Sequence, residues 1–323
     1  MLNSSANHSR VRATGATLAL IVLALALLGS GCGSTPPHQP QATPAEATPS
    51  PSVSAAAVQP SATQPCGVSQ HPPQHYQHVV WILMENRDYP QIVGSSEAPY
   101  LNHLAQLCGL ATDYRAITHP SLPNYIALTS GSTQGISDDG PPSSHQLAVA
   151  SIFSLLGGGW ASLDEAMPSP CDLSSTGDYA TKHNPAVYYT NVASQCGRQD
   201  RPLTSPPDLS ASFTMITPNL CDDMHDCATR SGDSWLSTEV PQLLDSPQYR
   251  SGQTAIFITW DEGIDTDQVV PTLVLAPTVV PGVRPATAYN HYSLLRTTEE
   301  LLGLSPLLGG AASAASLRAG FNI

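Results

Sequence analysis

A nearly unbroken apolar run, Gln77-His78-Val79-Val80-Trp81-Ile82-Leu83-Met84, ends in the polar pair Glu85-Asn86. Such a run is typical of a strand that is buried on both faces of a parallel sheet. Three further runs share this character, at residues 212–217, 255–260 and 272–276. Helical patterns lie between the runs, at 99–107 and after Ser293, which can cap a helix. Strands that alternate with helices predict a doubly wound α/β fold, with three α/β/α layers around a mostly parallel central sheet.

Polar pairs follow two of these strands, Glu85-Asn86 after the first and Asp261-Glu262 after the run at 255–260. In open α/β sheets, ligands bind beyond the carboxyl ends of the strands. Each pair taken alone is also compatible with an ordinary solvated turn. Both pairs together predict one shared crevice at this edge of the sheet.

A second signal is the segment Thr118-His119-Pro120-Ser121-Leu122-Pro123-Asn124-Tyr125. Pro123 fits the first turn of a helix and Gly131 can end it, so Ser121 is expected at the helix N-terminus. Backbone N–H groups and the helix dipole bind anions there and favour an ionised hydroxyl. The position suits a nucleophile that attacks phosphorus, although a serine before a helix is also an ordinary cap.

The first 32 residues are predicted to be an export signal. Arg10 and Arg12 precede an apolar stretch, and Cys32 stands at the end of a cleavage-site pattern. A cysteine at this point is typical of bacterial lipoproteins, so we expect a lipid on Cys32 and a location on the outer face of the cell membrane. Gly29 stands where leucine is usual, and plain secretion or a retained anchor are the alternatives.

Residues 33–65 contain eight prolines, no aromatic residue and one charge. Such a segment buries too little apolar surface to offset its chain entropy, so we interpret it as a disordered linker rich in Pro, Ala, Ser and Thr. The predicted catalytic domain is therefore 66–323.

Six cysteines fall in this domain: Cys66, Cys108, Cys171, Cys196, Cys221 and Cys227. An even number in an exported chain indicates disulfides, and six cysteines allow 15 connectivities that sequence cannot separate. Loop length favours Cys171–Cys196 and Cys221–Cys227, which leaves Cys66–Cys108. A metal cluster is the rival interpretation, but the chain has no C-x₂-C pair.

Four motifs occur in order along the domain: Glu85-Asn86-Arg87, His119-Pro120-Ser121-x-Pro123-Asn124-Tyr125, Pro218-Asn219 followed by Asp222-x-x-His225-Asp226, and Trp260-Asp261-Glu262. Together they resemble the phosphoesterase family that includes acid phosphatases and phosphatidylcholine-type phospholipases C. That family belongs to the alkaline-phosphatase-like superfamily, so the resemblance implies its fold and the hydrolysis of phosphate esters. Each motif is weak alone, and four in sequence are fairly specific.

The resemblance implies a role for each matching residue. It makes Ser121 the nucleophile, and it assigns a divalent metal to Glu85, Asn86, Ser121, Asp261 and Glu262. It places His225 and His183 in the phosphate pocket and His291 at the active site, at the start of a helix. Asp88-Tyr89 stands where members often carry Ser-Phe, and no long C-terminal region follows, which favours a compact phosphatase over a phospholipase.

Several of these residues also have simpler explanations. His183 fits a surface loop, and His225 fits a tight disulfide loop between Cys221 and Cys227. His119 is expected to orient its loop rather than to bind metal. Asp138-Asp139 resembles a metal pair but is more often a solvated turn.

The charge balance points to a metal independently of the resemblance. The 323 residues carry 12 Lys+Arg and 25 Asp+Glu, a formal net charge of −13, and Lys182 is the only lysine. This balance argues against nucleic-acid binding, which uses basic patches. An anionic phosphate ester needs local positive charge, and a divalent metal is the economical source. Oxygen ligands suit Mg²⁺, Ca²⁺ or Mn²⁺, and Zn²⁺ if a histidine joins.

We therefore predict an enzyme that hydrolyses phosphate monoesters outside the cytoplasm, through a phosphoserine on Ser121. His225 and His183 would hold the phosphate oxygens, and His291 or water would protonate the leaving alcohol. One alternative is a phospholipase C or phosphodiesterase acting on phospholipid head groups. A non-catalytic substrate-binding lipoprotein is the second. No protein partner is implied.

Overall fold

The computed structural model describes residues 58–323, so the predicted export signal, Cys32 and most of the predicted linker lie outside the described residues. The last residues of that linker lie on the domain: Pro60 and Pro65 are buried, and Ala62 N donates to Asp245 Oδ1 (3.1 Å). Residues 58–60 lie beside residues 250–253, just ahead of a central strand. The described fold therefore begins before Cys66.

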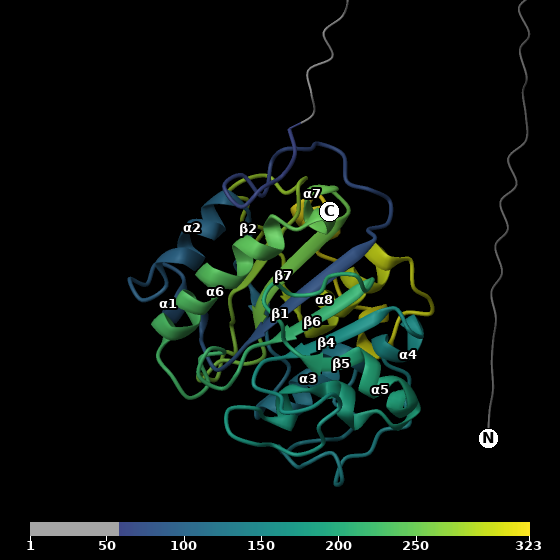
Figure 1. Ribbon diagram of the computed structural model, residues 1–323. Coiled ribbons are helices and arrows are strands. Elements are labelled where there is room, and N and C mark those ends of the chain that lie inside the picture. Colours follow the sequence, from purple (N-terminus) through teal and green to yellow (C-terminus); the bar gives the residue numbers. More distant parts are fainter. Residues whose placement is uncertain (1–57) are drawn as a thin grey trace, which may run out of the picture. The chain divides into compact units, whose positions relative to one another are not determined.

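A seven-stranded sheet forms the centre of the domain, in the order β2-β8-β7-β1-β6-β4-β5 (Figure 1). Its strands are β1 (His78–Met84), β2 (Gly109–Ala111), β4 (Trp160–Asp164), β5 (Asp200–Pro202), β6 (Phe213–Thr217), β7 (Thr254–Trp260) and β8 (Thr272–Leu275). Strands β7, β1, β6, β4 and β5 are parallel, whereas β8 is antiparallel to both of its neighbours. The predicted mostly parallel sheet is confirmed, and its four predicted strands are β1, β6, β7 and β8.

Helices pack around this sheet in two groups. The α-helices are α1 (Tyr89–Ile92), α2 (Pro99–Leu107), α3 (Ser121–Ser130), α4 (Ile152–Leu156), α5 (Ala193–Gln199), α6 (Thr229–Leu244), α7 (Pro247–Arg250), α8 (His291–Leu302) and α9 (Arg318–Phe321). Helix α2 packs against α6, and Figure 1 shows the two side by side. Helix α3 packs against α8, which also contacts β1.

Shorter elements complete the domain. Four 3-10 helices are present in the described chain: η1 (Thr181–His183), η2 (Pro185–Tyr188), η3 (Thr190–Val192) and η4 (Gly309–Ala312). A small parallel pair joins β3 (Tyr114–Arg115) to β9 (Tyr289–Asn290), immediately before α8. Within residues 58–323, no helix combines the length and the apolar character that crossing a membrane requires.

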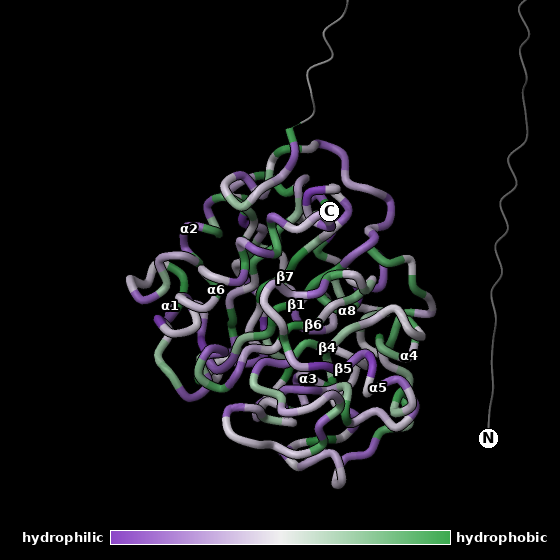
Figure 2. Tube along the Cα trace, viewed as in Figure 1, coloured by the Kyte–Doolittle hydropathy of each residue, from purple (hydrophilic) through white to green (hydrophobic). Residues whose placement is uncertain are grey.

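The centre of the sheet is apolar, which explains why its strands could be recognised. Every residue of β7 and every residue of β1 after His78 is buried, and Figure 2 shows apolar residues gathered on the central strands. In the register of β1 with β7, Met84 pairs with Trp260. The next residue of each strand, Glu85 and Asp261, therefore comes to the same carboxyl edge of the sheet.

Both ends of α2 and both ends of α3 agree with the sequence prediction, whereas the start of α8 differs from it. Helix α2 has its predicted bounds, and α3 begins at Ser121 and ends before Gly131, whose φ is 74°. The prediction that Ser293 caps α8 is wrong, because Asn290 is the cap. Ser293 N donates to Asn290 Oδ1 and Asn290 N donates to Ser293 Oγ, so the serine is the inner member of a capping box.

Three disulfides tie the loops to this framework: Cys66–Cys108, Cys171–Cys196 and Cys221–Cys227. These are the pairings that loop length favours, and they leave none of the six cysteines for a metal cluster.

Candidate active site

Glu85 is the centre of the site. It follows β1 and is completely buried. Its Oε1 accepts a hydrogen bond from Tyr125 Oη (2.7 Å) and lies 3.0 Å from His183 Nε2. Its Oε2 accepts from Ser121 Oγ (3.2 Å). One carboxylate thus joins the end of β1 to helix α3 and to η1.

Ser121 is the first residue of α3, as predicted, and its side chain is buried. The N-cap of the helix is Pro120, and the Ser121 hydroxyl makes no cap hydrogen bond. The hydroxyl donates to Glu85 instead. The simpler explanation, in which Ser121 is only a helix cap, therefore does not apply.

The acidic pair after β7 meets the pair after β1. Asp261 Oδ1 accepts from the backbone N of Glu262 (2.6 Å) and of Asn86 (3.4 Å), and Asn86 has a positive φ of 54°. Glu262 Oε1 lies 2.7 Å from His119 Nδ1, and its Oε2 accepts from Asn124 Nδ2 (3.1 Å). The structure therefore brings together the two strand ends from which the crevice was predicted.

These carboxyl groups lie so close together that they change one another's protonation. Burial raises the pKa of Glu85 well above its usual range, and the charges of Asp261 and Asp223 raise it further. Burial also raises the pKa of Asp261 to about 7 and that of Asp223 to about 7. The pKa of Glu262 is raised to about 9 by burial and by Asp261. A buried cluster of acids in this state favours a bound cation.

His183 lies on the other side of Glu85, in η1, and is only 2% exposed. Its ring stacks on Tyr125, with centroids 5.3 Å apart, and its Nδ1 lies 3.2 Å from Asp223 Oδ2. Burial lowers the pKa of His183 well below its usual range, and the neighbouring Lys182 and His225 add to that effect. The surface-loop explanation of His183 is therefore wrong.

The only lysine of the chain also belongs to this site. Lys182 Nζ lies 3.0 Å from His225 Nε2 and 3.2 Å from Asp139 Oδ2. The other oxygen of Asp139 accepts from Leu122 N (2.9 Å) in the first turn of α3. Burial lowers the pKa of Lys182, but the charges of Glu85 and Asp139 outweigh it, so the pKa is raised and the side chain is cationic.

His291 is where the motif places it, at the start of α8, but it is completely buried. Its Nδ1 lies 3.0 Å from Tyr114 Oη, and its Nε2 lies 2.5 Å from the backbone oxygen of Asp261. Burial lowers its pKa to about 4. Because both ring nitrogens are engaged, His291 supports the chain after β7 and does not face a leaving alcohol.

Sequence reasoning assigned no role to four residues of the site: Asn124, Asp139, Lys182 and Asp223. Asn124 and Asp223 both lie inside quoted motifs, so the sequence could have indicated them. Lys182 carried a signal too, since a lone lysine in an acidic chain is unusual. Asp139 is partly exposed, and only the fold brings its turn to α3.

The donor set fits a divalent cation. Single ligand atoms of Glu85, His183 and His225 all lie within 4.8 Å of one another. Three buried atoms of the cluster make no hydrogen bond: His183 Nε2, Asp223 Oδ2 and Asp261 Oδ2. His183 Nε2 and Glu85 Oε1 are therefore only 3.0 Å apart without forming a hydrogen bond, as expected for two groups that face a common ion. Carboxylate oxygens with an imidazole suit several divalent metals.

An open hollow of about 380 Å³ adjoins the cluster. It is lined by Thr118, His119, Ile264, Asp265, Thr266 and Gln268. His119, whose side chain is 63% exposed, connects the hollow to Glu262. His119 is thus the residue through which this hollow adjoins the buried cluster.

Comparisons with known sequences agree with this chemistry. A model of the phosphoesterase family matches residues 95–305. The phosphatidylinositol-3-phosphatase of Mycobacterium tuberculosis is 31% identical over 246 residues, which cover 74% of this chain and 81% of that protein. The acid phosphatase of Aspergillus fumigatus is 29% identical over 71% of this chain, and the phosphate-repressible acid phosphatase of Penicillium chrysogenum is 30% identical over 72%. The matches span 55% and 60% of those two fungal proteins.

Solved structures show the fold. A protein of the alkaline phosphatase superfamily from Vibrio parahaemolyticus superposes with a TM-score of 0.52 and 13% identity, covering 77% of this chain and 69% of that one. The lipoteichoic acid synthase of Listeria monocytogenes superposes with a TM-score of 0.54 and 12% identity, covering 75% and 77%. The predicted alkaline-phosphatase-like fold is confirmed.

Proposed function

This chain belongs to the phosphoesterase family, whose members are phosphoric ester hydrolases, and we propose that it cleaves phosphate monoesters at Ser121. One observation carries the proposal. A buried serine hydroxyl begins helix α3 and contacts Glu85, inside a cluster of acids that fits a divalent cation. Nucleophile, cation site and anion-binding helix end thus coincide at one point.

We assign the metal to the predicted ligands Glu85, Asn86, Ser121, Asp261 and Glu262, with His183 close enough to join. A divalent cation there lowers the pKa of a serine hydroxyl and neutralises charge on a phosphate oxygen. Asn86 and Glu262 are the less well supported of these proposed metal ligands. Asn86 contacts Asp261 through its backbone, and both carboxylate oxygens of Glu262 already have partners.

The chemical step takes place at Ser121. Its Oγ bonds to phosphorus as the bond from phosphorus to the leaving alcohol breaks. The hydroxyl proton passes to Glu85 Oε2, its hydrogen-bond acceptor, and water supplies the proton that the alcohol takes up. The hydroxide that remains from this water then attacks phosphorus as the bond from Ser121 Oγ to phosphorus breaks. Glu85 returns its proton to Ser121, and inorganic phosphate is released.

Lys182 and His225 are proposed to hold the phosphate oxygens. Their side-chain nitrogens lie 3.0 Å apart, and Asp139 links Lys182 to the first turn of α3. Donors at that position stabilise the charge that spreads over the oxygens in the transition state. His291 is a positioning residue, because both of its ring nitrogens face protein groups, whereas Nε2 of His183 remains available to the cation.

The test is phosphate release from p-nitrophenyl phosphate, measured after EDTA treatment and after each divalent metal is restored. Ser121→Ala is expected to lower turnover by at least about a thousandfold while the protein stays folded. Ser130→Ala is the matched control, since this buried serine of the same helix donates to backbone oxygens, accepts from Gln134 Nε2 and makes no hydrogen bond to Glu85. Activity of Ser121→Ala within tenfold of the parent would contradict the assignment.

A phosphoinositide monoester is the second candidate substrate. It is favoured by the similarity to the mycobacterial phosphatidylinositol-3-phosphatase, which extends over most of that protein. Vesicles containing phosphatidylinositol 3-phosphate separate this substrate from soluble monoesters. Phosphatidylcholine vesicles test the phospholipase alternative, whose water-soluble product is phosphocholine. Release of inorganic phosphate or of phosphocholine excludes a protein that only binds its substrate.

We also propose that the enzyme works outside the cytoplasm, as a domain at 66–323 behind a linker and an export signal. The three disulfides support this location, because they persist in oxidising compartments. Lipid on Cys32 predicts that the mature protein partitions into detergent and that Cys32→Ser releases it. Equal partitioning of the two forms would exclude the lipid.

A further inference from the structure

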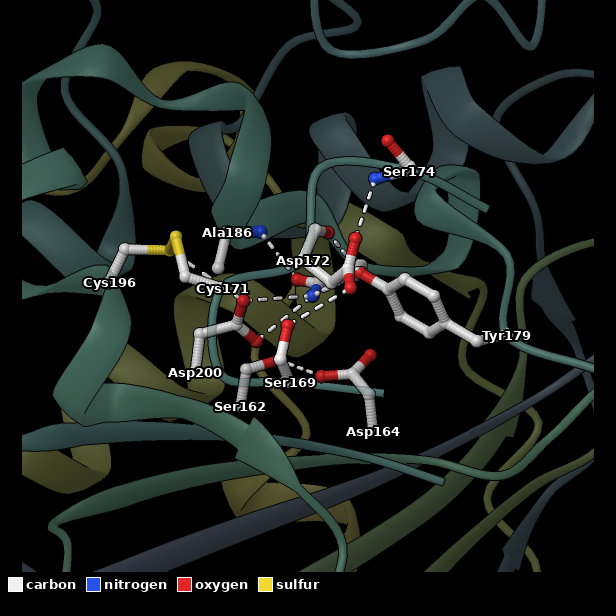
Figure 3. The surroundings of a disulfide bond; sticks show 11 residues. Ser162, Asp164, Ser169, Cys171, Asp172, Ser174, Tyr179, Ala186, Cys196 and Asp200 are labelled. Atoms are coloured by element: carbon white, nitrogen blue, oxygen red, sulfur yellow. Dashed lines mark hydrogen bonds between the residues drawn. A yellow bond between two sulfur atoms is a disulfide. The ribbon is translucent and has the colours of Figure 1, made fainter. Parts of the chain in front are cut away.

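A second pair of buried acids lies behind the active site. Asp164 is the last residue of β4 and Asp200 is the first of β5, and each is at most 2% exposed. In the register of these strands Ser162 is opposite Asp200, and Ser162 Oγ donates to Asp164 Oδ2 (2.9 Å). Figure 3 shows the three side chains together beside the Cys171–Cys196 disulfide.

No cation balances this pair among residues 58–323. The titratable groups that face it are Tyr179 and Asp172 and, in the small pocket beside Asp164, Glu165, Asp178 and His183. The acidic groups add negative charge when ionised, and burial lowers the pKa of His183, so its ring is neutral. On the side of α5 the nearest group is Cys196 Sγ, 3.6 Å from Asp200, which is in a disulfide and does not titrate. Asp164 is on the same face of β4 as Ser162, which is opposite Asp200, and the two carboxyl groups are within hydrogen-bond reach of each other. Two such groups, without a cation, stay together most easily when they share a proton.

The pair is connected to the active site through Asn184. This buried residue follows His183, and its Nδ2 donates to both oxygens of Asp200 (2.9 and 3.1 Å). Its Oδ1 accepts from Ala186 N at the start of η2. The bonds of Asn184 therefore fix the end of the turn that carries Lys182 and His183.

We infer that Asp164 and Asp200 share a proton and, through Asn184, position the Lys182–His183 turn, so that loss of this proton at high pH lowers turnover. The inference rests on the proposed function, in which Lys182 holds the phosphate. In the shared state an O–H donates between the two carboxyl groups, and Asp200 keeps both bonds from Asn184. When the proton is lost, two buried carboxylates repel each other and draw Asp200 away from Asn184.

The burial of Asp164 and Asp200 and the contact between them set the pH range in which the shared proton is lost. They raise the pKa of Asp200 to about 7 and that of Asp164 well above its usual range. Because the folded values lie above the unfolded ones, the pair contributes stability that is fully present only below the unfolded pKa of about 4. That contribution is lost as the pH rises through about 7 and beyond.

The test compares the whole chain with Asp164→Asn across pH 5–9. The amide keeps a donor between the side chains and removes one of the two charges. We expect the alkaline limb of kcat/KM for p-nitrophenyl phosphate to move up by about one pH unit, and Tm to fall less steeply with pH. An alkaline limb that does not move in a folded variant overturns the inference.

Glu299→Gln is the matched control. Glu299 is a buried carboxyl group on α8 that accepts from Leu308 N, and burial raises its pKa to about 7. The change is expected to alter the dependence of Tm on pH and to leave the alkaline limb of kcat/KM in place. An equal movement of that limb would show a general stability effect and would overturn the positioning role.

Asn184→Ala tests the connection itself. This variant is expected to lose about tenfold or more in kcat/KM at every pH, because the turn loses its support. In the double variant Asn184→Ala/Asp164→Asn, the alkaline limb should match that of Asn184→Ala alone. A limb that still moves in the double variant would show that Asn184 is not the link.

Two further outcomes are informative. If Asp164→Asn does not fold, Asp200→Asn replaces it, since either change leaves one carboxyl group. If the parent releases no phosphate, the proposed function fails, and the inference is judged on Tm. An equal dependence of Tm on pH in parent and variant would then overturn it.

Discussion

Lys182 is the only lysine of the chain, and its ammonium group lies where an acidic domain has to receive an anion. Residues 66–323 carry ten Lys/Arg against 24 Asp/Glu, so the surrounding field repels phosphate esters. A single cationic side chain held between Asp139 and His225 therefore contributes more to phosphate binding here than it would in a domain of balanced charge.

Replacing this cation tests its role. Lys182→Ala is expected to lower kcat/KM by about a hundredfold, because a cationic donor to the phosphate oxygens is lost from an otherwise acidic site. Steady-state hydrolysis of p-nitrophenyl phosphate measures the change. Arg250→Ala, at an exposed cation on α7, serves as the control and should stay within about twofold of the parent. Equal activity of Lys182→Ala and the parent would remove Lys182 from the site.

Among the elements, α3 depends on how it ends as well as on how it begins. Gly131 has a φ of 74°, and a Cβ added there would lie 2.2 Å from the backbone oxygen of Leu308. Gly135 has a similar φ of 77°, but its Cβ would meet nothing within 4 Å. The two glycines separate the cost of the backbone conformation from the cost of close packing.

We predict that Gly135→Ala lowers the free energy of unfolding by about 1 kcal/mol, the cost of the left-handed conformation alone. Gly131→Ala is expected to cost about 3 kcal/mol or more, because the loop that carries Leu308 must also move. Urea unfolding of both variants measures the difference. Equal losses would mean that the contact with Leu308 relaxes without cost.

Elements with a strong local signal could be predicted from sequence. β1 and β7 are apolar on both faces, and parallel topology alone then brings Glu85 to Asp261. The cap of α8 was mistaken because Asn290 and Ser293 are both good capping residues, and only the start of the helix decides between them. The buried partners of His291 depend on tertiary packing, which its motif does not encode.

On the scale of the whole molecule, the segment between β4 and β6 was largely beyond sequence reasoning, which assigned only its His183 to the site. The segment also carries Lys182, Asn184 and Asp200, and no periodic pattern indicates which of its faces meet. The acids at the ends of β1 and β7 were predictable as a group. The proton-sharing state of Asp164 and Asp200 was not, because it arises from the pairing of β4 with β5.

The acid cluster also predicts how metal affects stability. The pKa values of Asp223, Asp261 and Glu262 are raised to between about 7 and about 9, so the metal-free domain loses stability as the pH rises through this range. A bound divalent cation replaces those protons. Its addition should therefore raise Tm more at pH 8 than at pH 5.

Thermal unfolding in EDTA and with each divalent metal measures this effect. Asp261→Asn, which removes one charge from the cluster, is expected to reduce the gain in Tm at pH 8. The matched change Asp208→Asn removes an exposed carboxylate and should leave the gain unchanged. A gain that is the same at both pH values would contradict a cation held by these acids.

Residues 58–60 join the domain beside residues 250–253, which precede β7, whereas Ser121 lies beyond the carboxyl ends of the same strands. A strand of seven residues is roughly 23 Å long, so the point of chain entry and the reaction centre are on opposite rims of the sheet. A fusion partner or a solid support attached ahead of residue 58 would therefore leave the mouth of the catalytic centre unobstructed. Immobilisation through the amino-terminal end is accordingly the orientation that keeps bulky substrates within reach.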